Sequence, residues 1–268
     1  MSNEVLFEKV GRKAYITLNR PKKLNALTLD MYKDISRILD EIDLDDTIRV
    51  VILRGENHVF SAGWDLGLAE NLTVFQERNK ILKICNANRW KIWNSTKIFI
   101  AQVERYALGG AFELILPCDY IIAAEDAIVG EPELQFGEPP AYLMVPWLTD
   151  LRTAKKLLLT GEKITAKEAA EYHLITQAVP KEKLEETVEQ LAKKLMAGFG
   201  AGVAWQKQGI NRSYEMMGMR TAIDNFVDTG LFFKLMKDEE ILEFNRIVNE
   251  QGLKAAMAWR DANLADGQ

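Results

Sequence analysis

Residues 106–140 read YALGGAFELILPCDYIIAAEDAIVGEPELQFGEPP and decide the fold of this chain. Two glutamates in this stretch, Glu113 and Glu133, stand beside glycine turns in otherwise apolar sequence. A carboxylate in apolar surroundings costs free energy unless it has a partner or a chemical role. The two glutamates are therefore the first candidates for functional side chains.

The residues around Glu113 predict a strand, a glycine turn and the start of a short buried helix. Residues 98–103 are bulky and apolar, Leu108-Gly109-Gly110 follows, and residues 111–118 have the apolar content of a buried helix. Glycines allow a tight turn and the close approach of a ligand, and the first N–H groups of a helix are free to bind developing negative charge. Glu113 lies one turn further into this helix.

The residues around Glu133 repeat the arrangement. Residues 120–124 and 127–130 predict two more strands, and Glu131-Pro132-Glu133 follows the second. Both Glu113 and Glu133 are thus expected at the ends of strands or helices, where α/β proteins build their sites.

These motifs together resemble a known signature. The run ALGGAFELxxxCD followed by GEPELQFGEPP is similar to that of the crotonase, or enoyl-CoA hydratase/isomerase, superfamily. NRP at 19–21, NAL at 25–27, VVILRG at 50–55 and FSAGWDL at 60–66 occur in the family's order and spacing, so the resemblance covers residues 5 to 190. It implies an α/β fold with a crotonase-like ββα spiral core over residues 1–195, which holds the CoA-thioester site. A C-terminal helical oligomerisation region is implied for residues 196–268.

The resemblance also implies an activity, that of an enoyl-CoA hydratase-like lyase adding water reversibly across the α,β double bond of an acyl-CoA thioester. In the family, the backbone N–H groups that correspond to Trp64 and Gly110 form an oxyanion hole for the thioester oxygen. Fixed donors of this kind lower a barrier by roughly 3 kcal/mol each. In hydratases one glutamate activates water and the other exchanges the α-proton, and Glu113 and Glu133 occupy these two positions. Coenzyme A is then part of the substrate, and no separate cofactor is implied.

Five further residues are expected to bind substrate: Ala62, Ala141, Tyr142, Lys22 and Lys23. The two lysines flank the NRPKKLNAL turn with Arg20, and one of these three basic residues is expected to reach the phosphates of CoA. The chain departs from the commonest hydratase pattern after Pro140, where residues 141–147 replace a glycine-rich stretch. The acyl group, straight-chain, cyclic or aromatic, therefore stays open.

Other activities within the superfamily also stay open. A Δ3,Δ2-type enoyl-CoA isomerase would use one carboxylate. The GEPPAYL run and Trp90-Lys91 resemble hydroxycinnamoyl-CoA hydratase-lyases, although those enzymes tend to lack a glutamate at the Glu113 position. A non-catalytic RNA-binding relative is disfavoured by the net charge of −5 and by the intact pair of glutamates.

Structural roles compete with these chemical ones. Glu113 could interact with the dipole of its helix, and Glu133 could cap its turn. Glu131 and Glu138 are interpreted as facing solvent or a salt-bridge partner, the alternative being that they raise the pKa of a neighbouring acid. Of the aromatic residues near the motifs, only the backbone of Trp64 is assigned a role.

Composition limits the remaining classes. The chain has two histidines, His58 in a loop and His173 in a predicted helix, and two distant cysteines, so no metal site is expected. The N-terminus lacks the pattern of a secretory signal, and no apolar run approaches the ~20 residues of a membrane helix. We expect a cytoplasmic protein without nucleic-acid or membrane partners, and the resemblance implies a homotrimer or homohexamer.

Patterns outside the motifs predict the remaining elements. Residues 4–10 and 14–18 predict paired strands, and residues 50–53 predict a buried strand. Thr28 is predicted to be the N-cap of the helix that follows it. Residues 153–159 predict a helix that stops at Gly161, and Thr165 with Glu168 a capping box. Alternating strands and helices favour a parallel sheet. From residue 181 onward the chain is predicted to be helical, with breaks at 198–202 and at Gly218.

Overall fold

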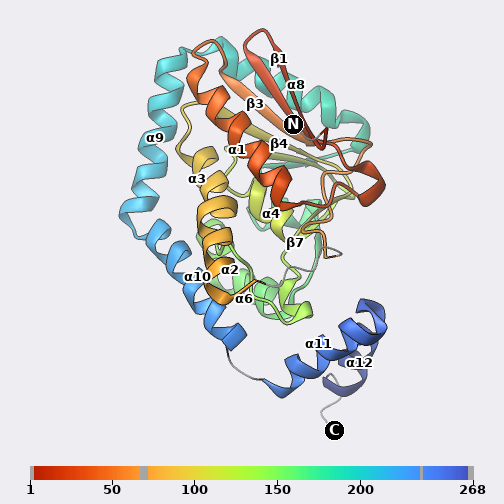
Figure 1. Cartoon of the computed structure of the whole chain (residues 1–268). Coiled ribbons are helices and arrows are strands. Elements are labelled where there is room, and N and C mark those ends of the chain that lie inside the picture. Colours follow the sequence, from red (N-terminus) through yellow and green to blue (C-terminus); the bar gives the residue numbers. More distant parts are fainter. Residues whose placement is uncertain (1–2, 67–71, 236–237, 265–268) are drawn as a thin grey trace.

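The protein is an α/β fold followed by a C-terminal helical region, as Figure 1 shows. The computed structural model describes residues 3–66, 72–235 and 238–264. The strands are β1 (Val5–Val10), β2 (Lys13–Leu18), β3 (Val50–Gly55), β4 (Ile98–Val103), β5 (Tyr106–Leu108), β6 (Tyr120–Ala124), β7 (Ile128–Gly130), β8 (Ile164–Thr165) and β9 (Gln177–Val179).

Helices connect the strands and form the whole C-terminal part. The α-helices are α1 (Leu29–Leu44), α2 (Val74–Lys80), α3 (Asn86–Asn94), α4 (Gly110–Ile115), α5 (Val145–Leu148), α6 (Leu151–Thr160), α7 (Ala166–Glu171), α8 (Leu184–Ala197), α9 (Gly200–Met216), α10 (Met219–Leu235), α11 (Glu239–Gln251) and α12 (Leu253–Leu264). The shorter helical turns are η1 (Pro21–Lys23), η2 (Ile81–Cys85), η3 (Glu133–Phe136) and η4 (Lys181–Lys183), of which η2 is a π-helical turn.

Two sheets carry the fold. The larger has the order β1-β2-β3-β4-β6-β9, in which β1 and β2 are antiparallel and every other neighbouring pair is parallel. The smaller has the order β5-β7-β8, with β5 and β7 parallel. Helix α1 packs against β1 and β2, and α8 packs against β3, β4 and β6 (Figure 1). The parallel strands are buried on both sides, which explains their continuous apolar sequences.

Local signals in the sequence predicted these elements correctly. The pairing of β1 with β2 is confirmed, and the Thr28 side chain accepts a hydrogen bond from the N–H of Met31 at the start of α1. Helix α6 ends at Gly161, which has a left-handed backbone. The capping box of α7 is complete, because Thr165 and Glu168 each accept a hydrogen bond from the other's backbone N–H.

The C-terminal part is helical, with one difference from the prediction. The break at Gly218 is confirmed, but the predicted break at 198–202 is wrong beyond residue 199, because α9 begins at Gly200 and includes Gly202. The three glycines signal weak helix propensity, and packing of the helix overrides it. Helices α9 and α10 follow one another along one side of the molecule, and α11 and α12 lie beyond them (Figure 1). The division into a core and an oligomerisation region stays a prediction, and its boundary at 195/196 falls inside α8.

Within the described ranges, no helix is both long and apolar enough to cross a membrane. The same residues contain no cluster of three or more His, Cys, Asp or Glu that is arranged to hold a metal ion.

Candidate functional site

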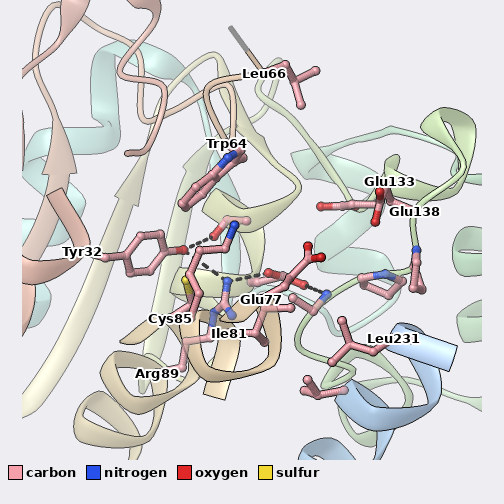
Figure 2. Close-up of a pocket in the computed structure, with 18 residues that line it drawn as sticks. Tyr32, Trp64, Leu66, Glu77, Ile81, Cys85, Arg89, Glu133, Glu138 and Leu231 are labelled. Carbon is pink, nitrogen blue, oxygen red and sulfur yellow. Dashed lines mark hydrogen bonds and ion pairs between the residues drawn. The ribbon is translucent and has the colours of Figure 1, made fainter. Parts of the chain in front are cut away.

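A cavity of about 320 Å³ lies where α1, α3, α4, η3 and α10 meet. Its wall includes Glu113 and Glu133 together with Trp64 and Gly110, residues that are far apart in the sequence. In Figure 2, Tyr32 points inward from one side, Arg89 reaches up from below, and Glu133 lies across from them. Val227 and Leu231 of α10 add apolar surface.

The glycine turn before α4 brings the backbone to this cavity. Gly109 has φ +52, and a Cβ atom built on it would lie 2.4 Å from Oε1 of Glu133, so only glycine fits there. Gly110 then begins α4, and Trp64 lies beside Leu27 in a parallel β-bridge. No described residue accepts a hydrogen bond from the N–H of Trp64 or of Gly110. Both residues line the cavity, as an oxyanion hole requires.

Glu113 is buried and surrounded by donors. Its side chain is 2% exposed, and its Oε2 accepts a hydrogen bond from Nη2 of Arg89 at 2.5 Å. Its Oε1 accepts from the backbone N–H groups of Ala141, at 2.5 Å, and Tyr142, at 2.7 Å. A carboxylate with a guanidinium and two N–H donors is compensated for its burial, whereas a neutral carboxyl group would leave donors unused.

Glu133 is in the opposite environment. Its Oε2 is buried, and no described residue forms a hydrogen bond with it. Burial, followed by the negative charge of Glu113, raises the pKa of Glu133 to about 8. At neutral pH Glu133 therefore holds a proton, while Glu113 is ion-paired.

A third acid, Glu131, corrects the sequence interpretation. It was expected to face solvent or a salt-bridge partner, but it is 5% exposed and neither carboxylate oxygen has a hydrogen-bond partner among the described residues. Burial, followed by the charges of Glu113 and Glu133, raises its pKa well above the usual range. Glu131 directly follows buried strand β7 and lines a small, mostly apolar cavity together with Phe112 and Leu157. Glu138 lies in the wall of the main cavity.

Sequence reasoning missed three residues of the site: Tyr32, Asn86 and Arg89. Arg89 is 2% exposed. Among the fully buried side chains of the described residues it has the largest volume, and Tyr32 has the next largest. Arg89 donates to Oδ1 of Asn86, to Oε2 of Glu113 and to Oη of Tyr32. The one available signal was Glu113 itself, since an acid in an apolar helix needs a cation, but the sequence does not say which one.

The other residues predicted to bind substrate divide between the cavity and its surroundings. Ala141 lines the cavity. Ala62 does not, and its N–H donates to the carbonyl of Leu24. Lys22 and Lys23 are exposed on η1.

Tyr142 reaches the site through its backbone and not through its ring. Its side chain is 0% exposed and packs edge-on against Trp90 with ring centroids 5.4 Å apart, so it has no surface in the cavity. Its backbone N–H, which donates to Glu113, is what connects Tyr142 to the site. The Tyr142 ring is buried because the segment that follows η3 packs against Trp90 of α3.

The two histidines lie outside the cavity wall. His58 is exposed with Nδ1 3.0 Å from Glu104, and His173 follows α7 in a turn with φ +62 instead of lying in a helix. The site as described is therefore a carboxylate site, with Glu113 paired and Glu133 protonated.

A family model described as enoyl-CoA hydratase/isomerase matches residues 10–246. The chain belongs to the enoyl-CoA hydratase/isomerase family. The match includes the FSAGWDL, ALGGAFEL and GEPEL motifs, and therefore every residue of the cavity described above.

Individual members of the enoyl-CoA hydratase/isomerase family agree with this over most of their length. A "probable enoyl-CoA hydratase, mitochondrial" of Dictyostelium discoideum is 35% identical over 212 residues, covering 78% of this chain and 76% of that protein. A crotonyl-CoA hydratase of Syntrophomonas wolfei subsp. wolfei is 30% identical over 270 residues and covers 97% of both. The crystal structure of an enoyl-CoA hydratase/isomerase from Xanthobacter autotrophicus Py2 has a TM-score of 0.91 at 33% identity, with 98% of both chains covered.

Proposed function

We propose that this protein is an enoyl-CoA hydratase, a hydro-lyase that adds water reversibly across the α,β double bond of an acyl-CoA thioester. One observation carries the proposal: Glu113 and Glu133 line the same cavity in opposite electrostatic environments. Two titratable groups whose surroundings favour opposite protonation states are suited to act as base and acid in one reaction. The names of family relatives support the same reaction.

The proposed chemistry follows from these environments. Glu113, as a carboxylate, takes a proton from water while the water oxygen bonds to Cβ. The π electrons move to Cα and the thioester oxygen, where the N–H groups of Trp64 and Gly110 stabilise the charge. Glu133 then delivers its proton to Cα. The cycle ends with Glu113 protonated and Glu133 ionised, and exchange with solvent restores both.

We assign substrate binding to the surrounding wall. Ala141 lies in this wall beside the base Glu113. Ala62 lies outside the wall, two residues before the oxyanion residue Trp64, and Lys22 or Lys23 on η1 binds the phosphates of CoA. Tyr142 contributes its backbone, since its side chain is buried. Coenzyme A belongs to the substrate, and the reaction needs no further cofactor.

The assembly and location are part of the same proposal. We expect a homotrimer or homohexamer in the cytoplasm, with an acyl-CoA as ligand and without nucleic-acid or membrane partners. The net charge of −5 supports the absence of nucleic-acid binding.

A double-bond isomerase is the second candidate. Glu133 has a buried carboxylate oxygen without a described partner, whereas three donors occupy Glu113. An isomerase needs one group that removes and returns a proton, and Glu133 in its ionised form could do this alone. A hydratase-lyase acting on hydroxycinnamoyl-CoA would differ in releasing an aldehyde and acetyl-CoA.

The deciding experiment follows the ultraviolet band of the conjugated thioester. Purified protein is mixed with straight-chain, cyclic and aromatic enoyl-CoAs, beside Glu113→Gln and Glu133→Gln. Loss of the band with one acyl class, slowed about 100-fold or more by either substitution, is the expected result. Turnover of a β,γ-enoyl-CoA that survives Glu113→Gln would instead identify the isomerase. No turnover of any substrate overturns both proposals.

A further inference from the structure

Arg89 is a buried cation whose contacts all lie in the proposed catalytic site. Its guanidinium contacts Glu113, Asn86 and Tyr32, and it lies 5.2 Å from the ring centroid of Tyr142. A buried ion pair adds little net stability compared with apolar residues of the same volume. The effect of Arg89 on Glu113 is therefore a better explanation of this pair than its contribution to folding.

Four groups form a closed ring of hydrogen bonds around the Glu113 carboxylate. Arg89 donates through Nη1 to Oδ1 of Asn86, and Asn86 donates through Nδ2 to the carbonyl of Ala141 at 3.1 Å. The N–H of Ala141 donates to Oε1 of Glu113, whose Oε2 accepts from Nη2 of Arg89. The ring fixes both oxygens of one carboxylate and the backbone segment after Pro140 at once.

A branch of the same network reaches the turn that carries Gly110. Nη2 of Arg89 donates to Oη of Tyr32 at 3.2 Å, and Tyr32 donates to the carbonyl of Gly110 at 3.2 Å. Figure 2 shows Tyr32 and Arg89 converging from different elements at this point. Arg89 thus connects the acid Glu113 with one of the two residues assigned to the oxyanion hole.

We infer that Arg89 is a positioning residue for the hydration reaction: with Asn86 it holds Glu113 in the ionised, fixed state in which Glu113 acts as the base. Arg89 does not touch the reacting atoms in this role and acts through Glu113. The kinetic consequences of this inference rest on the proposed hydratase function. The effect of Arg89 on the charge of Glu113 does not, because it is a property of the folded protein alone.

The π-helical turn η2 explains how the chain presents these residues. Asn86 and Arg89 are three positions apart on α3, so they share one face, and η2 ends at Cys85 immediately before them. A π-helical turn shifts the face that follows it by one residue, and such turns occur often at functional sites. Directly after this turn, Asn86 bonds to Ala141 and Arg89 to Glu113 of α4.

Several other titratable groups face Glu113 and Arg89. They are Tyr32 on α1, Cys85 on η2, Glu131 after β7, Glu133 on η3 and Tyr142 after η3. The same cavity wall also carries Glu77, Lys80 and Glu138. Burial raises the pKa of Tyr32, Tyr142, Glu131 and Glu133, and the value of about 8 for Glu133 keeps that carboxyl group protonated at pH 7. Arg89 and Glu113 form a buried ion pair in this wall, each 2% exposed. Burial opposes the charge of Arg89, but Glu113 beside it raises the Arg89 pKa above its ordinary value.

The kinetic test compares Arg89→Gln and Arg89→Lys with wild type over a range of pH. Arg89→Gln should lower kcat about 100-fold at neutral pH, with KM changed less than about threefold, because Glu113 is no longer held in place as the base while the binding wall is kept. The acidic limb of the kcat–pH profile of Arg89→Gln should move to higher pH by about one unit or more, since Glu113 without a neighbouring cation takes up a proton more readily. Arg89→Lys keeps the positive charge and should return the acidic limb of the pH profile toward its wild-type position. Its kcat should stay low, because a lysine cannot replace the guanidinium hydrogen bonds to Asn86 and Tyr32.

Arg49→Gln is the matched control. Arg49 is also an arginine that donates to the protein's own backbone, at the carbonyls of Met196 and Gly198, but it lies outside the cavity. The Arg49→Gln substitution should leave the kcat–pH profile unchanged. An Arg89→Gln enzyme with the wild-type acidic limb and kcat, and only a lower unfolding midpoint, would show that Arg89 is structural and would overturn the inference.

A second measurement needs no activity and separates this inference from the proposed function. Unfolding midpoints are recorded from about pH 5 to about pH 8 for wild type, Arg89→Gln and the double variant Arg89→Gln/Glu113→Gln. Arg89→Gln should lose stability relative to wild type as pH rises, because ionising an unpaired, buried Glu113 is costly. The double variant should not show this loss. If both variants follow the same pH dependence, Arg89 does not hold the charge of Glu113 and the inference fails, whether or not hydration is observed.

Discussion

Glu133 is the residue whose protonation state matters most for the proposed reaction. It must carry a proton to deliver it to Cα, and its pKa is raised to about 8 by burial and by the charge of Glu113. For hydration, kcat/KM should therefore fall as pH rises through about 8, and stay level just below that value. A pH profile measured with the enoyl-CoA of highest turnover checks this. A profile that is flat through pH 8, or a limb that persists in Glu133→Gln with the same midpoint, contradicts it.

The same raised pKa predicts a loss of stability with pH. The carboxyl group of Glu133 has an ordinary value of 4.5 when unfolded and about 8 when folded. A group whose pKa is raised by folding favours the native state fully below the unfolded value and loses that contribution as pH rises through the folded value. Wild type should therefore lose stability between about pH 4.5 and pH 8 relative to Glu133→Gln, by a few kcal/mol at most. Chemical denaturation of both proteins at several pH values measures the difference, and parallel curves would exclude the raised pKa.

Gly109 is constrained from two directions. Its φ of +52 disfavours a side chain, and an added Cβ would overlap Oε1 of Glu133. Gly109→Ala should lower the free energy of unfolding by more than about 1 kcal/mol and reduce kcat, because Glu133 must move. Gly209→Ala on α9 is the control, since nothing lies within 4 Å of its added Cβ and it should be neutral or stabilising. Equal effects of the two substitutions would mean that Gly109 does not hold Glu133 in place.

The sequence alone predicted the two acids of the site and missed their electrostatics. Glu113 and Glu133 stand out because each is a carboxylate in an apolar run. Arg89 lies 24 residues before Glu113, and nothing local connects them, since their contact is created by the packing of α3 on α4. The burial of Glu131 was missed for the same reason: a strand end can face solvent or core, and only the tertiary arrangement decides.

At the scale of elements, Lys207 joins α9 to the sheet. It is 5% exposed and donates to the carbonyls of Ile92 and Lys97 and to the carboxylate of Asp119. Lys207→Gln should lower the free energy of unfolding by about 3 kcal/mol, because Asp119, whose side chain is only 14% exposed, is left without its cation. Adding Asp119→Asn to Lys207→Gln should recover part of this loss, and urea unfolding of the three proteins measures it. Strictly additive effects would show that the two residues do not act as a pair.

Elements with local signals were predicted well, and those without were not. Thr28, Thr165 and Gly161 mark helix ends through contacts a few residues away, so the sequence is sufficient to place them. The start of α9 at Gly200 and the π-helical turn η2 have no such signal. Both depend on packing against distant segments, which overrides propensity.

At the scale of the whole molecule, α9 and α10 present large apolar side chains to the outside. The exposed side chains include Phe199 at 93%, Met216 at 88%, Trp205 at 70% and Phe232 at 67%. These helices run one after the other along one side of the molecule (Figure 1). Large apolar side chains exposed along successive helices are typical of a protein–protein interface. It is the feature that supports the proposed homotrimer or homohexamer.

Trp205→Glu tests this assembly. A charge placed where the partner subunit covers an apolar surface is costly, because the carboxylate would be buried without a cation. Light scattering should give wild type the mass of three or six chains and the variant a smaller mass at the same concentration. Leu159→Glu is the control, since Leu159 is 68% exposed on α6, outside α9 and α10, and should leave the mass unchanged. A wild-type protein that is monomeric at micromolar concentration would contradict the proposed assembly, and a Trp205→Glu variant with wild-type mass would move the interface to another face.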